Sequence, residues 1–89
     1  MPRIVFTPQL QRFVEAPDFE ATALVLREAL EQAFGAHPRL RGYVLDDQQH
    51  LRTHVVIFID GQRQRDRIGL SESLRPDSQI HVLQALSGG

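Results

Sequence analysis

The sequence contains no cysteine and no lysine. Without cysteine there is no disulfide framework, no thiolate zinc site and no cysteine nucleophile. Without lysine there is no side-chain amine for Schiff-base chemistry, and the chain offers no side-chain acceptor for an isopeptide bond. All ten basic residues are therefore arginines.

An excess of basic charge and a long apolar run are also missing. The formal net charge is −1, which disfavours a general nucleic-acid binder because such proteins usually carry a strongly basic balance. No stretch approaches the roughly 20 apolar residues of a membrane span. The N-terminus meets Pro2 and Arg3 early and does not resemble a signal peptide. We expect one cytoplasmic domain with no nucleic-acid or membrane partner.

The first half of the chain predicts two strands and a helix. Residues 3–6 and 10–14 are expected to form a hairpin interrupted at Pro8. Residues 21–34 predict the main helix, with Gly35 as the C-terminal stop and Pro38 preventing continuation. Its apolar residues recur at helical spacing and predict one buried face, formed by Leu26, Leu30, Ala33 and Phe34.

The second half predicts strands at 43–45, 55–59 and 79–86, with a polar turn at 46–49 and a short helical turn within 70–78. Asp60–Gly61 is a typical hairpin turn. This order predicts an α+β protein with a mixed sheet of four to five strands and one main helix, the β-grasp or ubiquitin-like roll. One sheet face would be free for partners. Residues 1–83 would form the domain and 84–89 a flexible tail.

Several stretches together resemble the MoaD/ThiS family of ubiquitin-like sulfur carrier proteins. They are "LREALEQAF", "VVIFIDGQ" and "LSESLRPDSQIHVLQALSGG", with Gly88–Gly89 at the end. The resemblance implies that the Gly89 carboxylate is adenylated by a ubiquitin-activating-type enzyme that uses ATP and magnesium. Sulfur then replaces the adenylate and leaves a thiocarboxylate. Glycine suits this role because it lacks a side chain and can pass a narrow channel.

The resemblance also implies that the chain is a carrier substrate and not itself an enzyme, with no bound cofactor. Its partners would be the adenylating enzyme, a sulfur-accepting synthase and, in one branch, a metallopeptidase. The loop "LDDQQHLRTH" favours the carriers that serve cysteine-type synthesis. One alternative is a molybdopterin-synthase small subunit, which is disfavoured because Thr7 and Arg63 stand where such subunits are apolar. The other alternative is a modifier conjugated to protein lysines.

Partner-binding residues are expected beside the tail and on one predicted edge strand. Leu83 should point outward near the partner face, next to Leu86 and Ser87. Arg63 and Arg65 alternate with Arg67 and would share one face of an extended segment. They form either a docking stripe for an acidic partner or an edge strand protected by charge.

No metal or catalytic site is predicted. The four histidines are scattered, and His50 and His54 have the spacing of a metal pair only if that region is helical. The sequence indicates a loop and a strand there. No arrangement typical of nucleophilic catalysis or phosphate binding is present.

Overall fold

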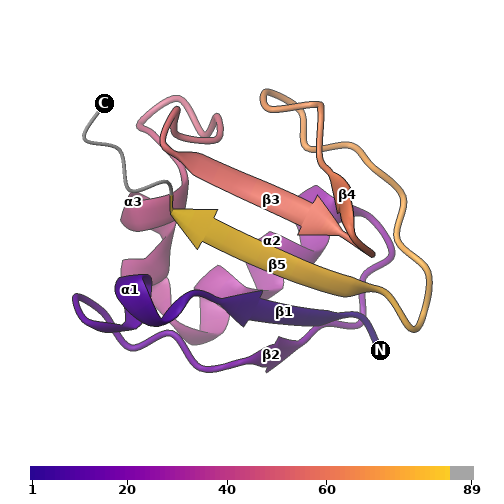
Figure 1. Ribbon diagram of the computed structural model, residues 1–89, viewed down its shortest axis with the longest axis horizontal. Coiled ribbons are helices and arrows are strands. Elements are labelled where there is room, and N and C mark those ends of the chain that lie inside the picture. Colours follow the sequence, from indigo (N-terminus) through magenta and orange to yellow (C-terminus); the bar gives the residue numbers. More distant parts are fainter. Residues whose placement is uncertain (85–89) are drawn as a thin grey trace.

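The computed structural model describes residues 1–84, which form a five-stranded mixed sheet with helices packed on one face (Figure 1). The sheet order is β2-β1-β5-β3-β4. The strands are β1 (Arg3–Phe6), β2 (Phe19–Glu20), β3 (Val55–Ile59), β4 (Gln62–Arg63) and β5 (Gln79–Gln84). The helices are α1 (Pro8–Gln11), α2 (Leu26–Ala36) and α3 (Arg41–Val44), with a 3₁₀ turn η1 (Pro38–Leu40).

The middle of the sheet is β5, which runs parallel to β1 and antiparallel to β3. A parallel pair needs a crossover, and the crossing element here contains α2, which lies behind the sheet in Figure 1. This topology confirms the predicted α+β mixed sheet and the β-grasp arrangement.

The hydrophobic core lies between the sheet and α2. Alternate side chains of the central strands point into it, including Ile4, Phe6, Ile80 and Val82, all at most 1% exposed. The predicted apolar helix face meets them, since Leu26, Leu30, Ala33 and Phe34 are all buried. Burying a side chain of leucine or phenylalanine size contributes about 1.5–3 kcal/mol, so this layer supplies most of the packing energy.

The strand predicted at 10–14 is wrong, because α1 occupies part of that region. Thr7 is the N-cap and its Oγ1 accepts from the Leu10 backbone N–H at 3.4 Å, while Pro8 takes the first helical position. A hydroxyl cap followed by proline is a helix-start signal. The partner of β1 is instead β2, which pairs through Phe19 and Glu20.

The main helix begins later and ends later than expected. Residues 21–25 are held out of the helix, since the Gln32 side chain bonds Thr22 and Ala23. Gly35 was expected as the stop, but it lies inside α2 with a negative φ. The helix ends at Ala36 with His37 as its C-cap, because Pro38 disfavours the helical conformation in the residue before it.

Two further predictions differ from the structure. Residues 43–45 do not form a strand: Arg41–Val44 form α3, and Leu45 makes an isolated bridge with Leu51. The segment 70–78 contains no helical turn, because Ser73 pairs with Val25 in another isolated bridge.

The polar turn at 46–49 is confirmed: Asp46 accepts the backbone N–H groups of Gln48 and His50. The Asp60–Gly61 hairpin turn is also confirmed, and both residues have positive φ, 52° and 84°. Such values are typical of a type I′ turn. Within residues 1–84, no helix is long and apolar enough to cross a bilayer.

Candidate functional site

The residues predicted to carry the chemistry follow β5. Gly88 and Gly89, together with the predicted partner contacts Leu86 and Ser87, lie outside the described residues. Their assignments stay predictions. Gln84, the first residue of the predicted tail, is the last residue of β5. The central strand of the sheet therefore leads directly into the segment that carries the double glycine.

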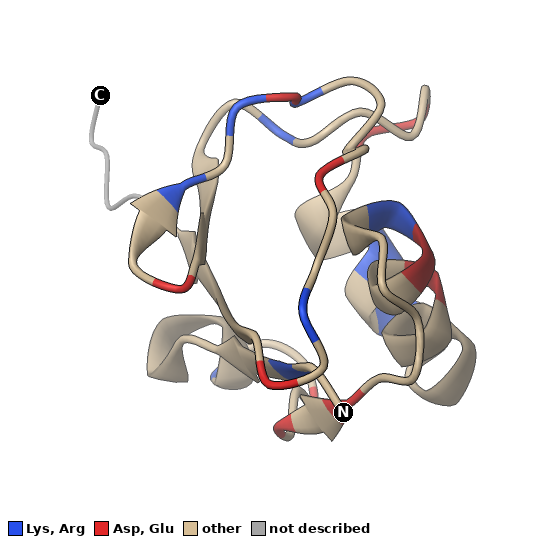
Figure 2. Cartoon of the chain, turned by 90° about the vertical axis from the view of Figure 1, so that its right-hand side faces the viewer, with Lys and Arg blue, Asp and Glu red and all other residues tan. Residues whose placement is uncertain are grey.

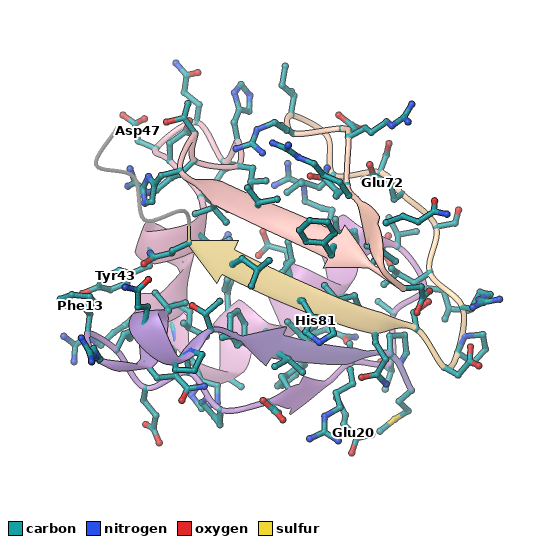
Figure 3. The ribbon with its side chains drawn as sticks, viewed as in Figure 1. Phe13, Glu20, Tyr43, Asp47, Glu72 and His81 are labelled. Carbon is teal, nitrogen blue, oxygen red and sulfur yellow. The ribbon has the colours of Figure 1, made fainter. Side chains whose placement is uncertain are left out.

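Leu83 points away from the core, as the alternation along β5 predicts. Ile80 and Val82 are buried on the helix side, whereas His81 is exposed and Leu83 is 37% exposed. Successive side chains of a strand point to opposite faces, so His81 and Leu83 share the uncovered face. His81 projects from the front of β5, on the side opposite the helices (Figure 3).

Neighbouring strands extend this surface into a patch, which we call the open face: Val5, Val56, Phe58, His81 and Leu83. The register places His81 between Val5 and Phe58 and places Val56 beside Leu83. Val5, Val56 and Phe58 are each half-buried. A contiguous apolar surface on one side of a small sheet is typical of a protein-interaction site.

The sequence analysis missed Val56, Phe58 and His81 as surface residues. The run Val55–Ile59 is entirely apolar, so it carries no polar alternation that would show which side faces outward. The usable signal was Asp60–Gly61, because a two-residue turn fixes the register of the hairpin and so the face of Phe58.

The three alternating arginines do not form one stripe. Arg63 ends β4 opposite Phe58, and Arg65 follows it in the loop; both are exposed. Arg67 is turned inward, and its guanidinium donates to the backbone carbonyl oxygens of Arg52 (2.5 Å) and Val55 (2.8 Å). Arg67 therefore fastens the loop to β3, while Arg63 and Arg65 remain at the surface.

Two carboxylates hold the loop that carries Arg65. Glu72 accepts the backbone N–H groups of Arg65 and Asp66, both at 2.9 Å. Burial opposes the charged form of Glu72, but these hydrogen bonds outweigh it and keep its pKa below the usual range. The loop position of Arg65 is thus fixed by the main chain rather than by its own side chain.

Asp66 organises the next part of the same loop. Its carboxylate accepts the hydroxyl of Ser71 at 2.6 Å and the backbone N–H of Gly69 at 2.9 Å. These bonds lower the pKa of Asp66 to about 2. Arg27 of α2 completes the attachment by donating to the carbonyl oxygens of Ile68 (2.6 Å) and Gly69 (3.2 Å).

Asp60 joins the β3–β4 hairpin to the start of β5. Its carboxylate accepts the backbone N–H of Gln79 at 2.8 Å and the hydroxyl of Ser78 at 2.9 Å. Both bonds hold the pKa of Asp60 below its ordinary value. The turn of the β3–β4 hairpin and the start of β5 are therefore held together through this carboxylate.

The remaining predicted features lie away from the open face. Thr7 caps α1, and His50 and His54 lie in the loop before β3. Among residues 1–84, no three histidine or carboxylate side chains come close enough to hold a metal ion. Two partly exposed aromatic residues, Phe13 and Tyr43, lie at the end of the molecule toward which β5 runs (Figure 3).

No protein-family model matches the sequence, and no curated protein matches it. Solved structures do match. SAMP1 from Haloferax volcanii is similar with a TM-score of 0.82 and 20% identity, over 99% of this chain and 98% of that chain. A chain of the BexX/CysO complex from Amycolatopsis orientalis has a TM-score of 0.83 and 14% identity, over 100% of both chains.

Urm1 from Sulfolobus solfataricus is also similar, with a TM-score of 0.71 and 14% identity, over 93% of this chain and 99% of that chain. Identities this low establish a shared fold and not a shared activity. The fold is the ubiquitin-like β-grasp, so the resemblance drawn from the sequence is confirmed at the level of the fold.

Proposed function

We propose that this chain is a ubiquitin-like sulfur carrier that works through the carboxylate of Gly89. The observation that carries the proposal is the course of β5. This strand bears His81 and Leu83 on the open face and leads, five residues after Gln84, to Gly89. Five residues span at most about 17 Å, so a partner bound to the open face can reach the terminal carboxylate.

The chain supplies a substrate group rather than catalytic groups. A carboxylate is a poor electrophile, so ATP first converts it to an acyl adenylate with release of pyrophosphate. A sulfur nucleophile then attacks the carbonyl carbon and AMP leaves with the bonding electron pair. The product is a thiocarboxylate on Gly89. The ATP, the magnesium ion and the catalytic side chains belong to a ubiquitin-activating-type enzyme in this scheme.

The open face supplies the docking surface in this proposal. Phe58 and Leu83 give it apolar area, and Arg63 and Arg65 give it a basic rim at the β4 edge. Apolar area at the centre of an interface supplies most of its affinity, and charged groups at the rim mainly set partner choice. Leu86 and Ser87 would extend this contact along the tail.

The sulfur acceptor belongs to the same proposal. The similarity to a chain of the BexX/CysO complex extends over the whole chain, and that complex shows a chain of this size bound to another protein. We favour an acceptor synthase of cysteine-type biosynthesis, with a metallopeptidase as a further partner, in the cytoplasm where ATP is available.

A protein modifier is the second candidate. It is favoured by the similarity to SAMP1 of Methanosarcina acetivorans, a small archaeal modifier protein, with a TM-score of 0.78 and 20% identity. Both functions share the adenylate and differ in the nucleophile, which is sulfur for a carrier and a lysine amine for a modifier. This chain has no lysine, so it could not form polymers of itself through side chains.

The shared first step is tested by ATP–pyrophosphate exchange with a candidate activating enzyme. The untagged chain should support exchange, whereas a variant with one alanine added after Gly89 should not, because its carboxylate is displaced from the reactive position. Arg39→Gln, an exposed change far from the open face, should behave like the unaltered chain. Equal exchange with the extended variant would contradict the proposal.

A further inference from the structure

The sheet ends at β4, and this edge has free backbone groups. Gln64 donates its N–H to the Ile57 carbonyl at 2.8 Å. Opposite residues in an antiparallel pair of strands alternate between hydrogen-bonded and non-hydrogen-bonded pairs. The preceding pair, Phe58 and Arg63, is therefore a non-hydrogen-bonded pair. The N–H and C=O of Arg63 therefore point away from β3, and no described group bonds to either.

A groove of ≈ 890 Å³ runs beside this edge, which we call the β4 groove. Three arginines and one carboxylate line it, with two glutamines between them: Gln62, Arg63, Gln64, Arg65, Arg67 and Glu72. A second hollow of ≈ 450 Å³ shares part of this lining and adds Arg75 together with its ion-pair partner Asp60. Basic segments lie along the hairpin edge and the loop after it, with the acidic segment of Asp66 between two of them (Figure 2).

Two of the three arginines that line the β4 groove, Arg63 and Arg65, form no ion pair among residues 1–84. Arg63 and Arg65 have no carboxylate within 4.0 Å among residues 1–84, and neither guanidinium makes a hydrogen bond there. The one carboxylate of the lining, Glu72, is already bonded to two backbone N–H groups and to the Gln64 side chain. The two guanidinium groups are therefore available to an acidic partner.

The side chain of Gln64 is part of the lining of the β4 groove and is almost fully buried. Gln64 is 4% exposed, and its Nε2 donates to the Asp66 carbonyl and to Glu72. Its Oε1 is buried and has no donor within the described part of the chain. Gln64 therefore ties the end of β4 to the loop through its Nε2.

We propose that the β4 groove binds an extended acidic segment of a partner polypeptide, laid along β4 as an added strand. Side chains at i and i+2 of a strand share one face, so two carboxylates spaced in this way would meet Arg63 and Arg65. The Arg63 backbone would pair with the segment. This site shares Arg63 and Arg65 with the rim of the proposed docking surface, but it does not require Gly89 or the sulfur-carrier chemistry.

A nucleic acid fits this groove less well than a peptide. The lining contains no aromatic side chain on which bases could stack. The chain as a whole carries a net charge of −1 and lacks the broad positive field that steers polyanions. An edge with a free N–H and C=O instead matches the backbone of an extended peptide.

The test is an NMR titration of the ¹⁵N-labelled full chain with a capped hexapeptide of alternating valine and glutamate. We expect chemical-shift changes centred on the amides of Arg63, Gln64 and Arg65. The double variant Arg63→Gln/Arg65→Gln should raise the dissociation constant about tenfold or more, since charge-assisted pairs would be lost. Arg12→Gln/Arg39→Gln, which removes the same charge from exposed sites elsewhere, should change it less than about twofold.

Several outcomes would overturn the proposal. Equal weakening in both double variants would show a general charge effect. Equal binding of a peptide with glutamine in place of glutamate would remove the acidic preference, and tighter binding of hexathymidylate at the same amides would indicate a nucleic-acid site. A chain lacking Gly89 should bind the peptide unchanged, which separates this result from the fate of the sulfur-carrier proposal.

Discussion

At the scale of single residues, Leu83 and Leu24 form a matched pair for testing the open face. Both are partly exposed leucines, at 37% and 47%, but Leu83 lies on β5 and Leu24 precedes α2. Leu83→Glu should reduce the rate of adenylation at low carrier concentration about tenfold or more, because a charge would replace apolar contact at the interface centre.

Leu24→Glu should leave that rate close to the value of the unaltered chain. Far-UV circular dichroism of both variants checks that each is folded. If Leu24→Glu and Leu83→Glu slowed adenylation equally, the open face would have no special part in docking.

Asp66 predicts a pH dependence of stability. Its pKa is about 2 when folded, below the ordinary 3.8, so its charged form is favoured by folding. The stability it contributes is complete above pH 3.8 and is lost as the pH falls toward 2. Asp66→Asn should therefore lower the free energy of unfolding at pH 7, with a difference that closes between about pH 4 and pH 2.

Urea unfolding of both proteins across this pH range measures the effect. The same change at Asp46, Asp46→Asn, serves as the comparison. The Asp46 carboxylate holds a separate turn, and its pKa is also lowered. A difference between Asp66→Asn and the unaltered chain that stayed constant from pH 7 to pH 2 would show that the charge of Asp66 is not what holds the loop.

At the scale of elements, two glycines are expected to respond to alanine in opposite directions. Gly35 lies inside α2 with open space around its Cβ position, so Gly35→Ala should stabilise the protein by about 0.5–1 kcal/mol. Gly61 has φ +84° in the β3–β4 turn, and Gly61→Ala should cost about 1–2 kcal/mol.

Thermal unfolding measures both changes: a shift of 1 kcal/mol moves the midpoint by roughly 4–8 °C in a domain of this size. A lower midpoint for Gly35→Ala would show that this glycine is the helix stop predicted from the sequence, and that Pro38 does not set the end.

At the scale of the whole molecule, elements set by local signals could be predicted and those set by distant contacts could not. The apolar face of α2 and the Asp60–Gly61 turn follow from spacing and turn chemistry. The start of α2 does not, because the first N–H groups of the helix are satisfied by remote carbonyls: Leu26 donates to Glu72 and Arg27 to Leu70, both at 2.9 Å.

The candidate site likewise has features that could be predicted from the sequence and features that could not. The outward position of Leu83 follows from the alternation along β5, and the exposure of Arg63 follows from its place after a hairpin turn. The inward turn of Arg67 depends on the carbonyls of Arg52 and Val55, which only the folded chain brings within reach. The segment Thr7–Pro8 is different, since its helix-start signal was present and was overlooked.

The connections between the strands also bear on the docking step of the proposed function. The hairpin, the loop and β5 are tied together through Asp60, Asp66 and Glu72, so the open face is a fixed platform. A fixed platform lowers the cost of ordering on docking. In the proposed function, this platform is the part of the chain that a partner protein would contact.

The most direct test of the carrier function is the intact mass of the untagged protein after incubation with ATP, magnesium, a sulfur donor and a candidate activating enzyme. We expect a mass gain equal to one sulfur replacing one oxygen, located at Gly89 by fragmentation and absent when ATP is omitted. An unchanged mass, with adenylation of Gly89 demonstrated in the same reaction, would contradict the sulfur carrier and leave the lysine-directed modifier.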